Sequence, residues 1–184
     1  MRKKQLTIKE YKNIYGVHTI MVNNARCQKD FCSIIEKIIE EFLTDREVFF
    51  GLCRTDGINL SSEQQRNLKN EIPAFFQKNG EMQNLSKYLT VAKIESNNYD
   101  RNFILAIFDY YLETLMFNPK VDWHIFKQYY SDYQEHRFED FILNHYADIL
   151  LYYFDSGDFL ICFDSQKYNP SEIRNRFERL FQYN

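Results

Sequence analysis

The chain has 184 residues and a formal charge of −3 at neutral pH, with 45% hydrophobic and 17% aromatic residues but only five glycines and three prolines. This composition supplies enough apolar side chains for the core of one ordinary domain, and it excludes disordered, collagen-like and low-complexity chains. No uncharged apolar run reaches the roughly 18 residues of a transmembrane helix, and the basic N-terminal segment lacks the apolar stretch of a signal peptide. We therefore expect a cytoplasmic protein that does not enter a membrane.

The first part of the chain predicts two strands around one amphipathic helix. Residues 15–22 are rich in β-branched side chains, and residues 47–54 form a short apolar run that is typical of a buried strand. Between them, residues 25–46 predict a helix that Asn23 or Asn24 caps. The apolar side chains of this helix recur on one face, at Phe31, Ile34, Ile35, Ile38, Ile39, Phe42 and Leu43.

The middle of the chain predicts two further helices and one strand. Ser61 or Ser62, with a glutamine three residues later, forms the pattern of a capping box, and Pro73 should kink or end the helix that follows. Residues 78–84 are interpreted as a connector, and residues 86–96 as a strand. A helix over residues 100–117 is predicted from apolar pairs at Phe103/Ile104, Ile107/Phe108, Tyr111/Leu112 and Leu115/Met116.

Three more helices are predicted towards the C-terminus. Residues 121–130 and 135–147 have the pattern of short helices. Asn169 should cap the last helix, because an Asn side chain can accept a backbone N–H there, and Pro170 suits the first helical position.

A β-hairpin is predicted before that last helix. Residues 149–154 and 159–163 are strand-like, and residues 155–158, with the sequence DSGD, contain the Asp and Gly that tight turns prefer. Without a repeat or a linker, residues 1–184 are interpreted as a single domain. We expect an α+β fold that is mostly helical, with a small antiparallel sheet that includes this C-terminal hairpin.

The charges are distributed unevenly along the chain. Residues 1–30 contain seven basic and two acidic residues, whereas residues 131–164 contain eight acidic residues and one basic residue. The ordinary interpretation is that these acidic residues cap helices, form turns and cover solvated faces. The alternative is an acidic patch, interleaved with tyrosines, that steers docking to a cationic protein.

The sequence contains no recognisable motif for catalysis, metal binding or nucleic-acid binding. The sequence has no phosphate-binding glycine loop, serine nucleophile elbow, zinc helix or EF-hand, and its four cysteines form no CxxC pair. We therefore expect no cofactor, no metal and no catalytic residue. A pI near 5.8 and the absence of a nucleic-acid-binding motif also argue against direct binding of nucleic acid.

One cluster keeps an enzymatic alternative open. His136, Glu139, His145 and Asp148 have helical spacings that would suit a small metal-dependent hydrolase, although such pairs are more often solvated surface pairs. A non-catalytic regulatory module is a further alternative.

A family resemblance adds to these patterns. It covers the chain as a whole, and it is strongest in the segment HRFEDFILNHYADILLYYFDSGDFLICFDSQKYNPSEIRNRFERLF. With its many Phe, Tyr, Asn and Ile residues and its acidic C-terminal half, the chain resembles the immunity proteins of bacterial contact-dependent growth inhibition systems (the CdiI proteins), above all those that neutralise ribonuclease toxins. The resemblance implies an inhibitor that is not an enzyme and that blocks the active site of a cognate toxin domain in a one-to-one heterodimer.

The charge pattern agrees with this expectation, because a ribonuclease active site is cationic and an acidic surface can imitate the RNA backbone. Aromatic anchors would be needed for high affinity. The predicted contact surface consists of Glu139, Asp140, Tyr152, Asp155, Asp158 and Asp164.

Overall fold

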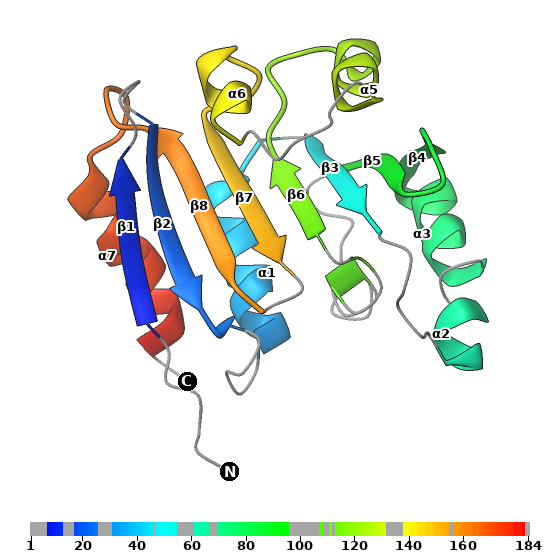
Figure 1. Cartoon of the computed structure of the whole chain (residues 1–184), viewed down its shortest axis with the longest axis horizontal. Helices are drawn as coiled ribbons and strands as arrows, with labels where there is room; N and C mark the ends of the chain where they lie inside the picture. The colour runs from blue at the N-terminus through cyan, green and yellow to red at the C-terminus, as the bar shows by residue number, and fades with distance from the viewer. Residues whose placement is uncertain are drawn as a thin grey trace.

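The structure is a computed structural model that describes residues 7–12, 17–25, 31–45, 47–54, 61–66, 70–95, 107–108, 111, 113–131, 138–154 and 157–182. Its centre is one eight-stranded sheet in the order β1-β2-β8-β7-β6-β3-β5-β4, in which every neighbouring pair is antiparallel (Figure 1). The strands are β1 (Thr7–Lys12), β2 (Val17–Asn23), β3 (Glu47–Cys53), β4 (Gly80–Asn84), β5 (Leu89–Glu95), β6 (Glu113–Phe117), β7 (Ile149–Phe154) and β8 (Phe159–Asp164).

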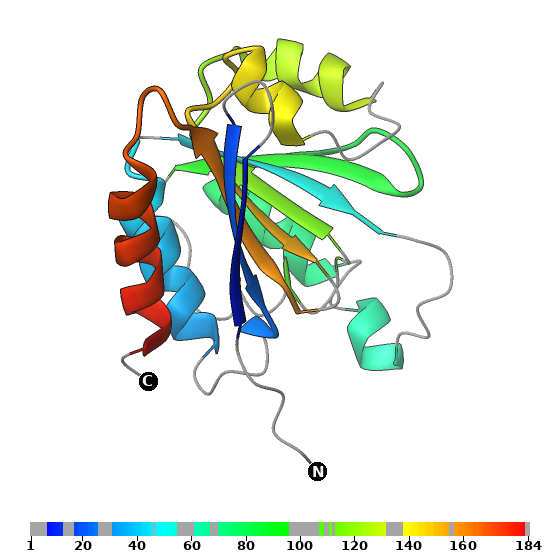
Figure 2. The ribbon, with the colours of Figure 1, turned by 60° about the vertical axis from the view of Figure 1, so that its left-hand side comes forward.

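Helices pack on both faces of this sheet (Figures 1 and 2). They are α1 (Phe31–Phe42), α2 (Ser62–Arg66), α3 (Ile72–Asn79), α5 (Trp123–Ser131), α6 (Phe138–Leu143) and α7 (Pro170–Gln182). One hydrophobic cluster joins the sheet to α1, α3 and α7, and a second cluster joins the opposite face to α5 and α6. Among the described residues, no helix is both long enough and apolar enough to cross a membrane.

The expectation of a mostly helical fold with a small sheet was wrong, because a single large sheet organises the chain. The clearest error concerns residues 113–117, which were predicted to be helical and form β6. Leu115 and Met116 are both buried, but they belong to the two different hydrophobic clusters. In a strand that is covered on both faces, consecutive residues are all apolar, so the alternation that marks a half-exposed strand is lost.

Both edge strands were also missed by the sequence-based prediction. β1 lies in the basic N-terminal segment, and β4 lies in residues 78–84, which were predicted to be a connector. Edge strands carry polar and charged side chains, so their sequences resemble loops. Pro73, which was predicted to kink or end the helix that starts near Ser61, lies in the first turn of α3, and residues 67–69 between α2 and this turn lie outside the described residues.

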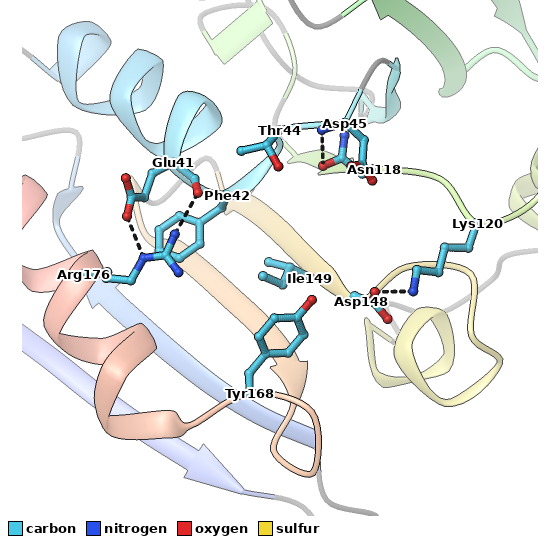
Figure 3. Close-up of a pocket in the computed structure, with 10 residues that line it drawn as sticks. All are labelled: Glu41, Phe42, Thr44, Asp45, Asn118, Lys120, Asp148, Ile149, Tyr168 and Arg176. Atoms are coloured by element: carbon cyan, nitrogen blue, oxygen red, sulfur yellow. Dashed lines mark hydrogen bonds and ion pairs between the residues drawn. The ribbon is translucent and has the colours of Figure 1, made fainter.

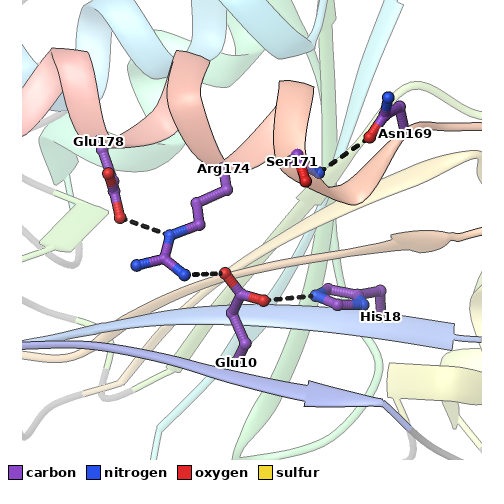
Figure 4. Close-up of polar contacts among 6 residues, drawn as sticks. All are labelled: Glu10, His18, Asn169, Ser171, Arg174 and Glu178. Atoms are coloured by element: carbon purple, nitrogen blue, oxygen red, sulfur yellow. Dashed lines mark hydrogen bonds and ion pairs between the residues drawn. The ribbon is translucent and has the colours of Figure 1, made fainter.

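Other elements agree with the prediction. The apolar stripe of α1 is buried, and β7 pairs with β8 as an antiparallel hairpin. The Asn169 side chain accepts a hydrogen bond from the Ser171 N–H at 3.0 Å, which caps α7 as expected (Figure 4).

Polar contacts attach the edge strand β1 to α7 (Figure 4). Glu10 accepts a hydrogen bond from Arg174 at 2.6 Å and lies 3.3 Å from Nε2 of His18 on β2. Arg174 also donates to Glu178, four residues further along α7. These contacts connect two strands and a helix that are far apart in the sequence.

Candidate functional site

The structure separates the residues of the predicted contact surface. Tyr152 is only 2% exposed and packs between the sheet and the layer of α5 and α6, so its predicted role as an exposed anchor was wrong. Tyr152 and Tyr153 do point to opposite faces, but helices cover both faces and neither ring reaches solvent.

Two of the predicted carboxylates organise the backbone around the hairpin. Oδ1 of Asp158 accepts a hydrogen bond from the Asn24 N–H at 2.8 Å, and Oδ1 of Asp164 accepts one from the Gln166 N–H at 2.8 Å. Both side chains are half-buried. These contacts fit the ordinary interpretation, in which acidic residues of this region form turns.

The remaining predicted contacts are described only in part. Glu139 and Asp140 lie on α6, but their side chains are outside the described part of the structure, as is the whole of Asp155. The acidic patch of residues 131–164 therefore stays a prediction.

The hydrolase alternative receives no support from the part of this cluster that is described. His145 is exposed with a φ of 61° after α6, and Asp148 is engaged by two lysines. His136 and the Glu139 side chain lie outside the described residues. Within the described residues, no group of three or more His, Cys, Asp or Glu side chains could hold a metal ion.

A different set of carboxylates meets at one end of β3 and β5. Glu47 is the first residue of β3 and Glu95 is the last residue of β5, and antiparallel pairing places them directly opposite each other. Asp45 lies in the short connection between α1 and β3. We refer to Asp45, Glu47 and Glu95 as the acidic edge; all three are exposed.

Asn118 holds this edge in place from the end of β6. Its side-chain N–H donates to the Glu47 carbonyl oxygen at 2.8 Å, and its side-chain oxygen accepts from the Asp45 N–H at 3.4 Å. One amide thus fixes the backbone on both sides of residue 46. The edge is therefore tied to the sheet at two points.

The acidic edge lines an open hollow of about 480 Å³, together with Pro119. Like charges directly opposite each other on neighbouring strands repel, and Glu47 faces Glu95 in this way. The carboxylates of Asp45 and Glu47 make no ion pair with any residue that the structure describes. A cation brought by another molecule can therefore pair with Asp45 or Glu47 without displacing a described partner.

A neighbouring cavity of about 300 Å³ shares Asp45 with that hollow (Figure 3). Two of the three carboxylates that line this cavity, Glu41 and Asp148, are neutralised within the protein. Arg176 donates to the Glu41 carboxylate at 2.6 Å and to the Glu41 carbonyl oxygen at 3.1 Å. Lys120 pairs with Asp148 on the opposite wall.

Asp148 also pairs with Lys167 at 3.0 Å. Burial by itself would raise the pKa of the Asp148 carboxyl, but hydrogen bonds and charge attraction from Lys120 and Lys167 outweigh burial and hold this pKa below its usual value. Tyr168 lines the same cavity, and burial followed by the charge of Asp148 raises the pKa of its hydroxyl. Asp148 is thus a structural anion with its own cations.

The acidic edge could not be found from the sequence. Glu47 and Glu95 lie 48 positions apart, and only the pairing of β3 with β5 brings them together. Counting charges along the sequence singles out residues 131–164, where many acidic residues follow one another. The acidic edge instead consists of carboxylates from separate segments of the chain. Only a correct prediction of the pairing register between β3 and β5 would have indicated that Glu47 lies opposite Glu95.

The chain was also compared with known proteins. No family model, no curated protein and no solved structure matches it.

Proposed function

We propose that this protein is a non-catalytic inhibitor that binds the cationic surface of a partner protein through its acidic edge. The chemistry fits an immunity protein that neutralises a bacterial toxin domain, with a nuclease as the target class. The observation that carries the proposal is that Asp45 and Glu47 line an open hollow beside Glu95 and make no ion pair with any residue that the structure describes.

Electrostatics favour this surface over the neighbouring cavity. Glu41 and Asp148 are already paired with Arg176 and with lysines, so binding a partner's cation there would require breaking an internal ion pair. Asp45 and Glu47 make no ion pair with any described residue, so no described ion pair has to be broken there. Exposed charges of one sign accelerate the encounter with an oppositely charged partner and orient it.

The surroundings of the edge supply rigidity. Asn118 fixes the backbone at Asp45 and Glu47, and Phe49 on the same strand is 2% exposed in a cluster of aromatic rings. A surface that is already ordered loses little conformational entropy on binding. Catalytic side chains have no part in this mode of action.

The proposal is tested by co-expressing the full tagged chain with the product of the open reading frame immediately upstream. We expect a one-to-one complex in size-exclusion chromatography with light scattering, and loss of the partner's nuclease activity. The double variant Asp45→Lys/Glu47→Lys should slow association at least tenfold at low ionic strength, and high salt should reduce this difference.

The matched control is Glu63→Lys/Glu71→Lys, which makes the same change in net charge at two exposed positions away from the acidic edge. Equal effects of the two double variants would mean that only net charge matters, and the edge would not be the contact surface. A chain that forms no complex and leaves the nuclease active would contradict the inhibitor function itself.

A further inference from the structure

A second hollow, of about 330 Å³, lies at the opposite end of the β3–β5 pair. Arg54 follows the last residue of β3, and its backbone N–H donates to the Tyr88 carbonyl oxygen at 2.9 Å, in the loop between β4 and β5. Both residues line the hollow. The size falls within the range of small-molecule sites.

The inner wall of this hollow is polar and buried. Thr90 and Tyr111 are each 6% exposed. The Thr90 hydroxyl donates to Oδ1 of Asn84 at 2.8 Å and is hydrogen-bonded to the Tyr111 hydroxyl. Because Oδ1 of Asn84 is occupied by Thr90, the NH₂ group of Asn84 is left as a hydrogen-bond donor.

Burial raises the pKa of Tyr111 to about 12, while the contact with Thr90 and the charge of Arg54 act in the opposite direction. The phenol is therefore protonated at neutral pH. Because the Thr90 proton goes to Asn84, the Tyr111 O–H donates to Thr90, and the phenol brings no negative charge to the hollow.

The loop that covers the hollow adds a further donor. Oγ of Ser86 accepts hydrogen bonds from the backbone N–H groups of Tyr88 at 3.1 Å and Leu89 at 3.0 Å. Its own O–H proton is therefore directed away from these two groups. The same loop carries Lys87, whose Nζ lies 3.3 Å from the Tyr88 hydroxyl.

The charged side chains among the described residues that line this hollow are both cationic. Arg54 and Lys87 are its cations, and none of the described residues that line it is acidic. The half-buried Arg54 makes no ion pair with a carboxylate among the residues that the structure describes. A guanidinium fork, an ammonium group and neutral N–H and O–H donors together suit an anion of more than one negative charge.

The rim of the hollow carries one exposed aromatic ring. Tyr88 is 36% exposed and is one of three large hydrophobic residues that the described structure leaves exposed. An exposed ring beside an anion site can pack against a planar group of the ligand. We propose that this hollow binds a small phosphate monoester that carries an aromatic ring, with the phosphate held by Arg54 and Lys87 and the ring against Tyr88.

This site is independent of the proposed inhibitor function, because it uses none of the acidic-edge residues. The test is isothermal titration calorimetry of the full chain with inorganic phosphate and with phenyl phosphate, at constant ionic strength near neutral pH. We expect phenyl phosphate to bind more tightly than inorganic phosphate. Arg54→Gln should weaken both ligands about tenfold or more, since it removes a charge-assisted hydrogen bond.

Lys37→Gln is the matched control, because it removes one exposed cation on α1, away from the hollow. Its affinities should remain within about twofold of the original chain, because a distant exposed charge is largely screened. Equal losses in Arg54→Gln and Lys37→Gln would overturn the site, as would the absence of phosphate binding. If Arg54→Gln fails to fold, Lys87→Gln on the exposed loop gives the same readout.

Tyr88→Leu tests the aromatic ring contact separately from phosphate binding. It should lower the affinity for phenyl phosphate severalfold and leave inorganic phosphate unchanged, because only the ring contact is removed. An unchanged affinity for phenyl phosphate would overturn the assignment of an aromatic ligand. Acetate binding as tightly as inorganic phosphate would overturn the assignment of a phosphate.

Discussion

The two ends of the β3–β5 pair present opposite charges. Glu47 and Glu95 face each other at one end, whereas Arg54 lies at the other end beside the loop that carries Lys87. A seven-residue strand spans about 20 Å, so the two ends are separate sites on one rigid element. The buried middle of the ladder fixes the fold, and its solvated ends are free to carry charge.

The carboxylates of the protein also fall into two groups, according to whether a cation of the protein pairs with them. Asp148 and Glu41 are held by cations of the protein, whereas Asp45 and Glu47 make no ion pair within the described part of the chain. A neutralised carboxylate stabilises the fold, and an unneutralised one is available to a partner. Ion pairing therefore distinguishes structural acids from candidate contact acids better than sequence position does.

The largest expected effect comes from breaking the ladder between the two ends. Phe50 lies in the middle of β3, is 1% exposed and packs edge-to-face against Phe76 of α3. Phe50→Ala should lower the free energy of unfolding by about 3–5 kcal/mol, because it removes buried area and leaves a cavity. Urea denaturation measures this loss.

The exposed Gln77 on α3 provides the control, since Gln77→Ala should change the stability by less than about 0.5 kcal/mol. Both ends depend on the same ladder, so partner binding and phosphate binding should weaken together when Phe50 is replaced. Loss of only one of them would mean that the two ends are not held by a common element.

The sequence predicted those features that are local in the chain. The stripe of α1, the cap at Asn169 and the β7–β8 hairpin each depend on residues that lie within a few positions of one another. Residues 113–117 were misassigned because their apolar pairs have helical spacing, and only burial on both faces reveals a strand. Long-range pairing is not contained in such patterns.

The same limit explains why the candidate sites were missed. Arg54 and Lys87 come together because Cys53 pairs with Leu89, just as Glu47 meets Glu95 through the same ladder. The predicted surface of residues 139–164 assumed that neighbours in sequence remain neighbours on the surface. Tyr152 shows the failure of that assumption, since it is buried beneath α5 and α6.

A smaller loss of stability than that of Phe50→Ala is expected when Asp148 is replaced, and it would show that Asp148 has a structural role. Asp148→Asn should lower the free energy of unfolding by about 1 kcal/mol or less near neutral pH, as is typical of partly exposed ion pairs. The folded-state pKa of Asp148 lies below its reference value of 3.8. Its contribution is therefore complete well above pH 3.8 and is lost as the pH falls through the lowered folded-state pKa.

The measurement compares the stability of the two chains in urea between neutral and acidic pH. The difference should shrink towards zero at the acidic end. A difference that persisted at low pH would indicate that packing, and not the ion pairs with Lys120 and Lys167, causes the loss.

The smallest expected change is an increase in the free energy of unfolding. It connects the stability of the fold with the proposed function. Glu47→Lys replaces a like-charge pair with an ion pair to Glu95, so it should raise the free energy of unfolding by about 0.5 kcal/mol. Glu47→Gln, which removes the repulsion but adds no attraction, should give an intermediate value. Urea denaturation at low ionic strength resolves the three chains, and added salt should bring them together.

The same substitution should weaken binding of the cationic partner, so that one change increases stability and decreases association. This opposition is what a surface selected for binding would produce, because a carboxylate opposite Glu95 is less favourable for the strand pair than a cation but attracts the cationic partner. If Glu47→Lys destabilised the fold, the opposed carboxylates would not repel each other in solution. The main argument for the acidic edge as a contact surface would then be lost, even if an inhibitory function survived on another face.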